Sequence, residues 1–122
     1  MQAEIQQAYN DSKTALKLWE RSAKEYVGVL EGLAKNEANL DSVTAQVTKE
    51  FDDGRVSKAA LKNIVAGDDR VLTAKAEVMR LKRSKEAYLC RIDYLKAQYD
   101  LEKKRMSAEM EECKRMDFNR TP

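Results

Sequence analysis

The feature that most constrains this chain is an apolar repeat of about 3.5 residues that runs through two long segments. From Ile5, alternating steps of four and three residues reach fourteen positions ending at Phe51, and eleven of them are apolar. From Val71, a similar pattern reaches fourteen positions ending at Met116, and eleven of these are again apolar. Such a repeat is typical of helices that pack lengthwise in coiled coils. It predicts two long α-helices, over about residues 3–50 and 69–116.

The segment between these helices is predicted to form an elbow with a short helix of its own. Asp52-Asp53-Gly54 is a turn signal that should end the first helix. Ser57 can cap a short helix over about residues 58–66. Gly67 suits a left-handed C-terminal cap, and Asp68 then caps the second long helix.

The matched lengths of the long helices predict the fold class. Each helix would be about 72 Å long at 1.5 Å per residue. An elongated antiparallel helical hairpin buries both apolar seams, so we expect one all-α domain over residues 1–122. Residues 117–122 lack the repeat and are expected to form a frayed tail.

Additional apolar residues beside the seams predict contacts beyond the hairpin. They widen each apolar stripe beyond what two helices need. We therefore expect a coiled-coil type homo-oligomer, or docking on a larger partner. These residues are Leu18, Val27, Val29 and Val43 on the first helix, and Leu72, Met79, Leu89, Leu101 and Met110 on the second.

Composition excludes most catalytic chemistry. The 122 residues include no His and only two Cys, so the usual general base and the common zinc patterns are missing. Cys90 and Cys113 would lie about 35 Å apart on one continuous helix, which excludes a disulfide between them and predicts two reduced thiols. The sequence also lacks a Gly-rich phosphate loop. We expect a protein that is not an enzyme and that needs no metal or cofactor.

Charge is distributed unevenly, although the formal net charge is only +2. Residues 70–105 hold eleven Lys or Arg against five Asp or Glu. A helical projection places four arginines and a tyrosine on one face that flanks the seam. These predicted nucleic-acid-binding residues are Arg80, Arg83, Arg91, Tyr94 and Arg105.

An arginine-rich face with an aromatic ring suits single-stranded nucleic acid. Guanidinium groups bind phosphate oxygens, and a tyrosine ring stacks on bases of any identity. The alternative is that these arginines pair with acidic residues of a neighbouring helix.

Two stretches resemble UvsY, the recombination mediator family of T-even-type phages, with a colinear likeness over about residues 7–100. Leu61-Lys62-Asn63-Ile64-Val65-Ala66-Gly67-Asp68-Asp69-Arg70-Val71-Leu72 is similar to the family's short helix, its Ala/Asp junction and the start of its later long helix. Ala87-Tyr88-Leu89-Cys90-Arg91-Ile92-Asp93-Tyr94-Leu95-Lys96 looks like a segment of that later helix. One feature departs from the family. Its basic–apolar–Asp–Tyr segment near the end of the first long helix has no counterpart in residues 42–51, whereas Arg91-Ile92-Asp93-Tyr94 lies on the second helix.

The resemblance implies a non-enzymatic, oligomeric phage protein that binds single-stranded DNA. Such a mediator helps to load a RecA-like recombinase by displacing single-strand-binding protein. Its location would be cytoplasmic, in the host cytoplasm if phage-encoded, because no apolar run approaches a membrane span and the first residues lack a signal-peptide pattern.

Two other interpretations remain open. The chain could be a helical-hairpin module for protein–protein interaction, such as a phage scaffold, an adaptor or a host-factor inhibitor, without nucleic-acid binding. It could also be a coiled-coil part of a larger structural protein.

Overall fold

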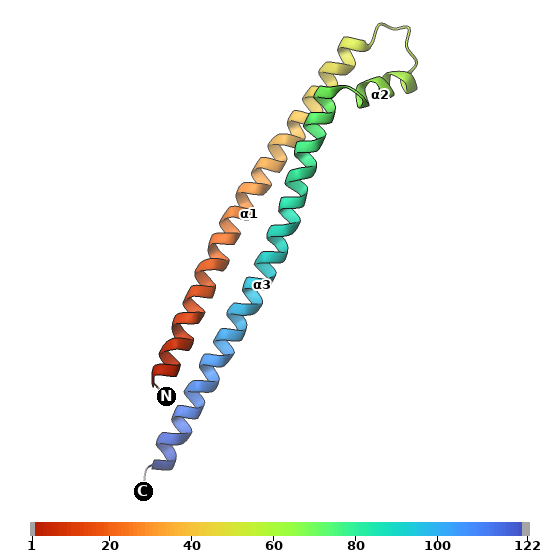
Figure 1. The fold of residues 1–122 in the computed structure, drawn as a ribbon. Coiled ribbons are helices and arrows are strands. Elements are labelled where there is room, and N and C mark those ends of the chain that lie inside the picture. Colours follow the sequence, from red (N-terminus) through yellow and green to blue (C-terminus); the bar gives the residue numbers. More distant parts are fainter. Residues whose placement is uncertain (1, 121–122) are drawn as a thin grey trace. The chain divides into compact units, whose positions relative to one another are not determined.

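A computed structural model describes residues 2–120 of the chain, with side chains up to Met116. Within these residues the regular structure is entirely helical and comprises α1 (Gln2–Phe51), α2 (Lys58–Ala66) and α3 (Asp69–Arg120) (Figure 1). Helices α1 and α3 pack against each other in antiparallel directions. The predicted all-α helical hairpin is therefore confirmed.

The helix boundaries follow the prediction except at the end of α3. The bounds of α2 and the start of α3 are as predicted, and α1 is one residue longer at each end. The predicted fraying is wrong for residues 117–120, because α3 continues to Arg120. The apolar repeat ends before these residues, but they contain neither Gly nor Pro, so nothing in their sequence stops a helix. Residues 121 and 122 lie outside the described part of the chain.

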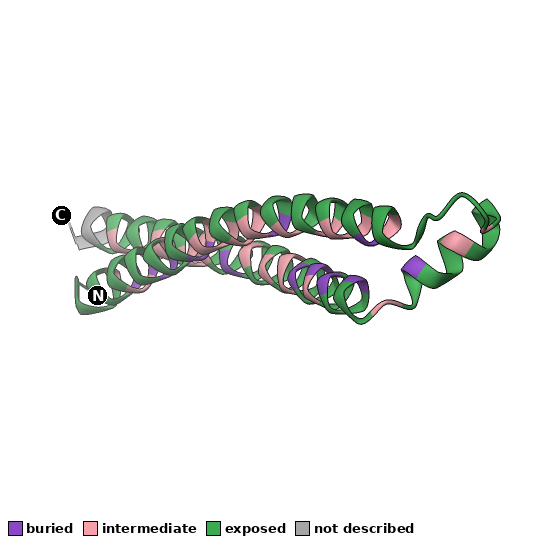
Figure 2. Ribbon diagram, turned by 90° about the horizontal axis from the view of Figure 1, so that it is seen from above, coloured by how far each residue is buried: buried purple, intermediate pink, exposed green. Residues whose placement is uncertain are grey.

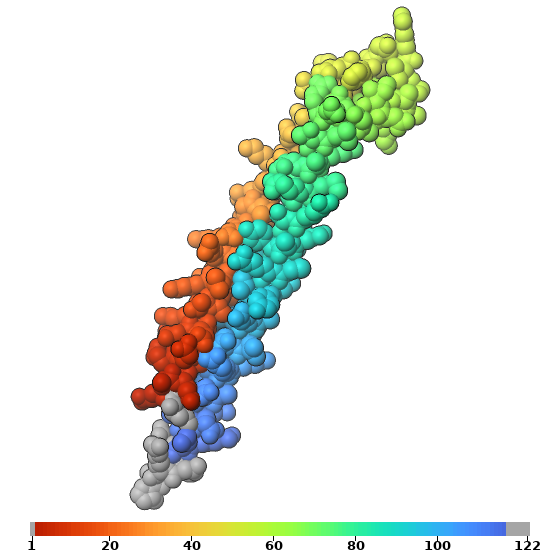
Figure 3. Space-filling model, viewed as in Figure 1, coloured from red at the N-terminus to blue at the C-terminus, as the bar shows by residue number. Residues whose placement is uncertain are grey.

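The structure divides into two compact units. The first, which we call the terminal unit, comprises Met1–Glu25 and Tyr88–Pro122. The second, the elbow unit, comprises Tyr26–Ala87. In each unit a part of α1 lies alongside a part of α3, as the colours of Figure 3 show. That residues 1–122 form one domain stays a prediction.

The core of the elbow unit joins all three helices. Figure 2 shows its buried residues on the sides of the helices that face one another. Leu40 of α1 packs against two buried clusters. These clusters are Val47, Val65 and Val71 in one, and Leu33, Val78 and Leu81 in the other. Because Val65 lies on α2, the short helix closes the end of the hairpin in this unit.

The core of the terminal unit consists largely of small side chains. Ala8, Ser12, Ala15 and Ser22 of α1 are buried, whereas α3 contributes the larger Leu95. Three of these small residues, Ala8, Ala15 and Ser22, are seven residues apart, which is the spacing of one coiled-coil position. Small residues along this line let the two backbones approach closely.

These small residues correct the predicted seam of α1. The prediction placed Tyr9, Leu16 and Ala23 at the centre, but Tyr9 is 42% exposed, while Ala8 and Ser22 are at most 1% exposed. The repeat length was right, and the phase was wrong at every second position, because large apolar residues were favoured over small ones. On α3 the predicted seam is confirmed, since all its positions from Val71 to Cys113 are buried or half-buried.

The ends of α2 show one confirmed cap and one corrected cap. The Ser57 hydroxyl accepts a hydrogen bond from the Ala60 N–H at 3.2 Å, as predicted. Gly67 has φ −91°, so the predicted left-handed cap is wrong. Its N–H donates to the Asn63 carbonyl at 3.1 Å while the backbone stays right-handed, and the chain then passes directly into α3. The Asp68 carboxylate caps that helix by accepting from the Arg70 N–H at 2.9 Å.

Candidate nucleic-acid interface

The five predicted binding residues all lie on α3 and are all exposed. Arg80 and Arg83 belong to the elbow unit, whereas Arg91, Tyr94 and Arg105 belong to the terminal unit. Their polar contacts divide them into two groups.

Arg80 is held by an acidic residue of its own helix. Its Nη2 lies 2.6 Å from Oε1 of Glu77, and its Nε lies 3.1 Å from Oε2 of the same residue. This pairing raises the pKa of Arg80 and lowers the pKa of Glu77. One edge of the Arg80 guanidinium is therefore already occupied.

Arg105 is held by residues of both long helices. Its Nη2 lies 2.9 Å from Oδ2 of Asp11 on α1, and its Nη1 lies 3.1 Å from Oε2 of Glu102 on α3. For Arg105, the alternative of pairing with an acid on a neighbouring helix is the arrangement observed.

Arg83, Arg91 and Tyr94 form the second group. No ion pair between residues with described side chains involves Arg83 or Arg91. Tyr94 is 67% exposed and lies three residues after Arg91, so the two side chains share one face of the terminal unit. These groups can contact phosphate and base without first losing an internal partner.

An acidic group near Arg91 is already satisfied by other residues. The Tyr88 hydroxyl donates to Oε2 of Glu25 at 3.0 Å, and Arg21 Nε donates to Oε1 at 3.2 Å. The hydrogen bond from Tyr88 is the main cause of a lowered Glu25 pKa, and the positive charges of Arg21 and Arg91 lower it further. Arg91 therefore contributes to the field at Glu25 without a direct bond.

We expect acid to weaken this contact between α1 and α3. Because the Glu25 pKa is lowered from 4.5, its ionised form stabilises the fold fully above pH 4.5, and this contribution is lost as pH falls towards the lowered value. Denaturant unfolding at about pH 6 and about pH 3 should show a smaller decrease in stability for Glu25→Gln than for the wild type. Equal decreases in the two proteins would contradict this role of Glu25.

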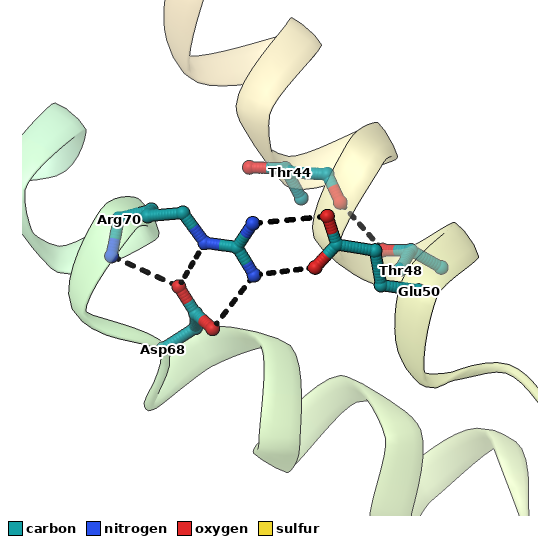
Figure 4. A network of polar contacts seen from close by, with 5 residues as sticks. All are labelled: Thr44, Thr48, Glu50, Asp68 and Arg70. Atoms are coloured by element: carbon teal, nitrogen blue, oxygen red, sulfur yellow. Dashed lines mark hydrogen bonds and ion pairs between the residues drawn. The ribbon is translucent and has the colours of Figure 1, made fainter.

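A denser polar network ties α1 to α3 in the elbow unit, and the sequence did not reveal it (Figure 4). Arg70 donates two hydrogen bonds to Glu50, from Nη1 at 3.0 Å and from Nη2 at 2.6 Å. Its Nε also donates to Oδ1 of Asp68 at 3.1 Å. These bonds raise the pKa of Arg70 and occupy its guanidinium, so we assign it a structural role.

A groove of about 340 Å³ between α2 and the long helices was also not predicted. Leu61, Val65 and Val71 supply apolar lining, and three lysines contribute amino groups. The lysines are Lys58, Lys62 and Lys75. The groove depends on how α2 folds back, which the helical repeat does not specify.

Helix α3 carries a second line of apolar and small residues on the side away from α1. Leu72 lies nine residues, or two and a half turns, from the buried Leu81, and Leu101 lies nine residues from the seam residue Ile92. These residues were predicted to lie beside the seam, but helical geometry places them opposite it, and Leu72 and Leu101 are 48% and 65% exposed. The line, which we call the outer stripe, consists of exposed residues at alternating three- and four-residue steps, with one extra step of four. They are Leu72, Ala76, Met79, Arg83, Ala87, Cys90, Tyr94, Ala97 and Leu101.

Other kinds of site are not found in the described residues. The side chains described there include no cluster of three or more His, Cys, Asp or Glu that could hold a metal ion. Among the helices of residues 2–120, none has the length and apolar content needed to cross a bilayer. Both cysteines are free thiols, as predicted.

Comparison of the chain with protein-family models, with curated proteins and with solved structures finds no match.

Proposed function

We propose that the chain binds single-stranded DNA through α3 and acts as a recombination mediator. The observation that carries this proposal is the exposure of Arg91 and Tyr94 on one face of the terminal unit, where neither the guanidinium nor the ring is engaged by the fold. Arg83 of the elbow unit supplies a second guanidinium without an ion pair among the described side chains. These are the two chemical groups that a single strand requires.

Binding would be electrostatic and insensitive to sequence. Each guanidinium would neutralise a backbone phosphate and release counterions, and the Tyr94 ring would stack on an unpaired base. Arg80 and Arg105 would contribute to the positive field, while their ion pairs keep them from forming the first contacts.

The mediator role adds a purpose to strand binding and is supported by the resemblance to the UvsY family. In this role, a homo-oligomer holds the strand in an extended path while a RecA-like recombinase replaces single-strand-binding protein. We place this activity in the cytoplasm, or in the host cytoplasm for a phage-encoded chain.

Replacing Tyr94 by Ala tests the stacking part of the proposal. We expect a loss of roughly 1–3 kcal/mol in the binding of a labelled single-stranded oligonucleotide, with no change in the salt dependence. Fluorescence anisotropy gives both quantities. The matched control is Tyr9→Phe, because Tyr9 is exposed to 42% but lies on α1 under the Lys13 ammonium. Unchanged affinity of Tyr94→Ala would exclude stacking at this position.

A second candidate function, a module for protein–protein interaction, is favoured by the outer stripe of α3. An exposed apolar line on a helix whose other side is already packed is typical of an interaction surface. The corresponding side of α1 is polar, with Lys17, Lys24, Glu31 and Lys35 exposed along it.

A further inference from the structure

The order of residues in the outer stripe is nearly the same in both directions along α3. Leu72 and Leu101 lie at its ends, Ala76 and Ala97 follow inwards, and Met79 and Tyr94 come next. When two such stripes lie antiparallel, each large residue faces a large one and each alanine faces an alanine. Side chains that match in size across a seam give the close packing that helix association requires.

We infer that a second copy of this chain packs antiparallel on the outer stripe. Residues 72–83 of one copy then face residues 90–101 of the other. The first range belongs to the elbow unit and the second to the terminal unit, so each half of the stripe meets the other half in the second copy. This inference deepens the second candidate function by naming its partner.

Charged residues along one edge of the stripe fit this pairing. In an antiparallel coiled coil, residues immediately before one set of seam positions meet their counterparts on the partner helix. Lys75 and Lys82 precede Ala76 and Arg83 on one half, and Asp93 and Asp100 precede Tyr94 and Leu101 on the other. Lys75 then faces Asp100 of the second copy, and Lys82 faces Asp93 of the second copy.

These four charged residues are unpaired within the single chain. All four are exposed, and none takes part in an ion pair between the described side chains. A symmetric dimer would therefore form four new ion pairs, two from each copy. The charge complementarity identifies a second copy, because an unrelated apolar partner has no need of this alternation of Lys and Asp.

Two polar features select the alignment. Arg83 faces Cys90 of the second copy within the seam, and a polar residue in a seam fixes alignment at a cost in stability. On the opposite edge, Arg80 faces Arg91 of the second copy, so like charges meet there. The dimer is therefore expected to be reversible.

The dimer and the DNA strand use overlapping surfaces. Arg83 and Tyr94 belong to the outer stripe and to the proposed strand site, so a second copy and a strand exclude each other at these residues. The mass of the protein without nucleic acid tests the dimer, and oligonucleotide binding tests the strand site, so failure of one is distinct from failure of the other.

An exchange of charges tests the pairing directly. One variant carries Lys75→Glu and Lys82→Glu, and the other carries Asp93→Lys and Asp100→Lys. Each variant alone places like charges at all four positions, and we expect its dissociation constant in sedimentation velocity to rise at least about tenfold. In an equimolar mixture the opposite charges meet again, so a mixed dimer should form with an affinity close to that of the wild type.

An apolar control separates the stripe from general effects of charge. Met79→Glu with Leu101→Glu should abolish the dimer, whereas Leu18→Glu on α1, where Leu18 is 37% exposed, should leave it intact. Circular dichroism confirms that each variant is still helical. The inference is overturned if the wild type has the mass of one chain at all concentrations, if the charge variants alone associate like the wild type, or if their mixture does not pair.

Discussion

Replacing Ser22 by Leu is expected to destabilise the fold by about 1–3 kcal/mol, because it forces a large side chain into a closely packed seam. Ser22 is 1% exposed in the terminal unit, where the small residues of α1 face α3. Combining Ser22→Leu with Ala15→Leu should cost about twice as much, since both sites lie on the same line of close approach. Thermal and denaturant unfolding measure the loss.

Two control variants separate overpacking from other effects. Ser22→Ala removes a buried hydroxyl that has no hydrogen-bond partner, so it should not decrease stability. Lys24→Leu adds the same side chain at an exposed position and should change stability little. If Ser22→Leu stabilises the protein instead, the seam of α1 has the predicted phase through Ala23 and not the phase observed.

The helices could be predicted because their causes are local. The apolar repeat, the turn at Gly54 and the Ser57 cap each act within a few residues, so they gave the boundaries of α2 to the residue. The phase of the α1 seam was missed, because it depends on how closely a second helix approaches. The conformation of Gly67 depends in the same way on where the next helix starts.

Reversing the charge of Arg83 and Arg91 together, with Glu at both positions, is expected to weaken strand binding by about a hundredfold at low salt. Two phosphate contacts are lost, and two acidic groups are added where the phosphates would lie. The matched control is Lys17→Glu with Lys24→Glu, which changes the net charge equally on the polar side of α1. Equal losses in both variants would indicate a diffuse charge effect and would contradict the assignment to α3.

The candidate site was predictable as a face but not as a set of available groups. Helical periodicity placed five residues together, and all five are exposed. Whether an arginine is engaged depends on its neighbours: Glu77 lies one turn from Arg80, while Asp11 reaches Arg105 only because α1 packs beside α3. The first contact can be found from the sequence by its spacing, and the second requires the tertiary structure.

The most direct test of strand binding by α3 is the dependence of oligonucleotide affinity on salt concentration. Fluorescence anisotropy at several salt concentrations gives this slope for the wild type and for Arg83→Ala with Arg91→Ala. We predict binding that weakens steeply with salt, and a slope that is smaller by about 1.4 in the variant, at about 0.7 per phosphate contact on a single strand. No binding by the wild type at low salt, or an unchanged slope in the variant, would contradict the proposed function.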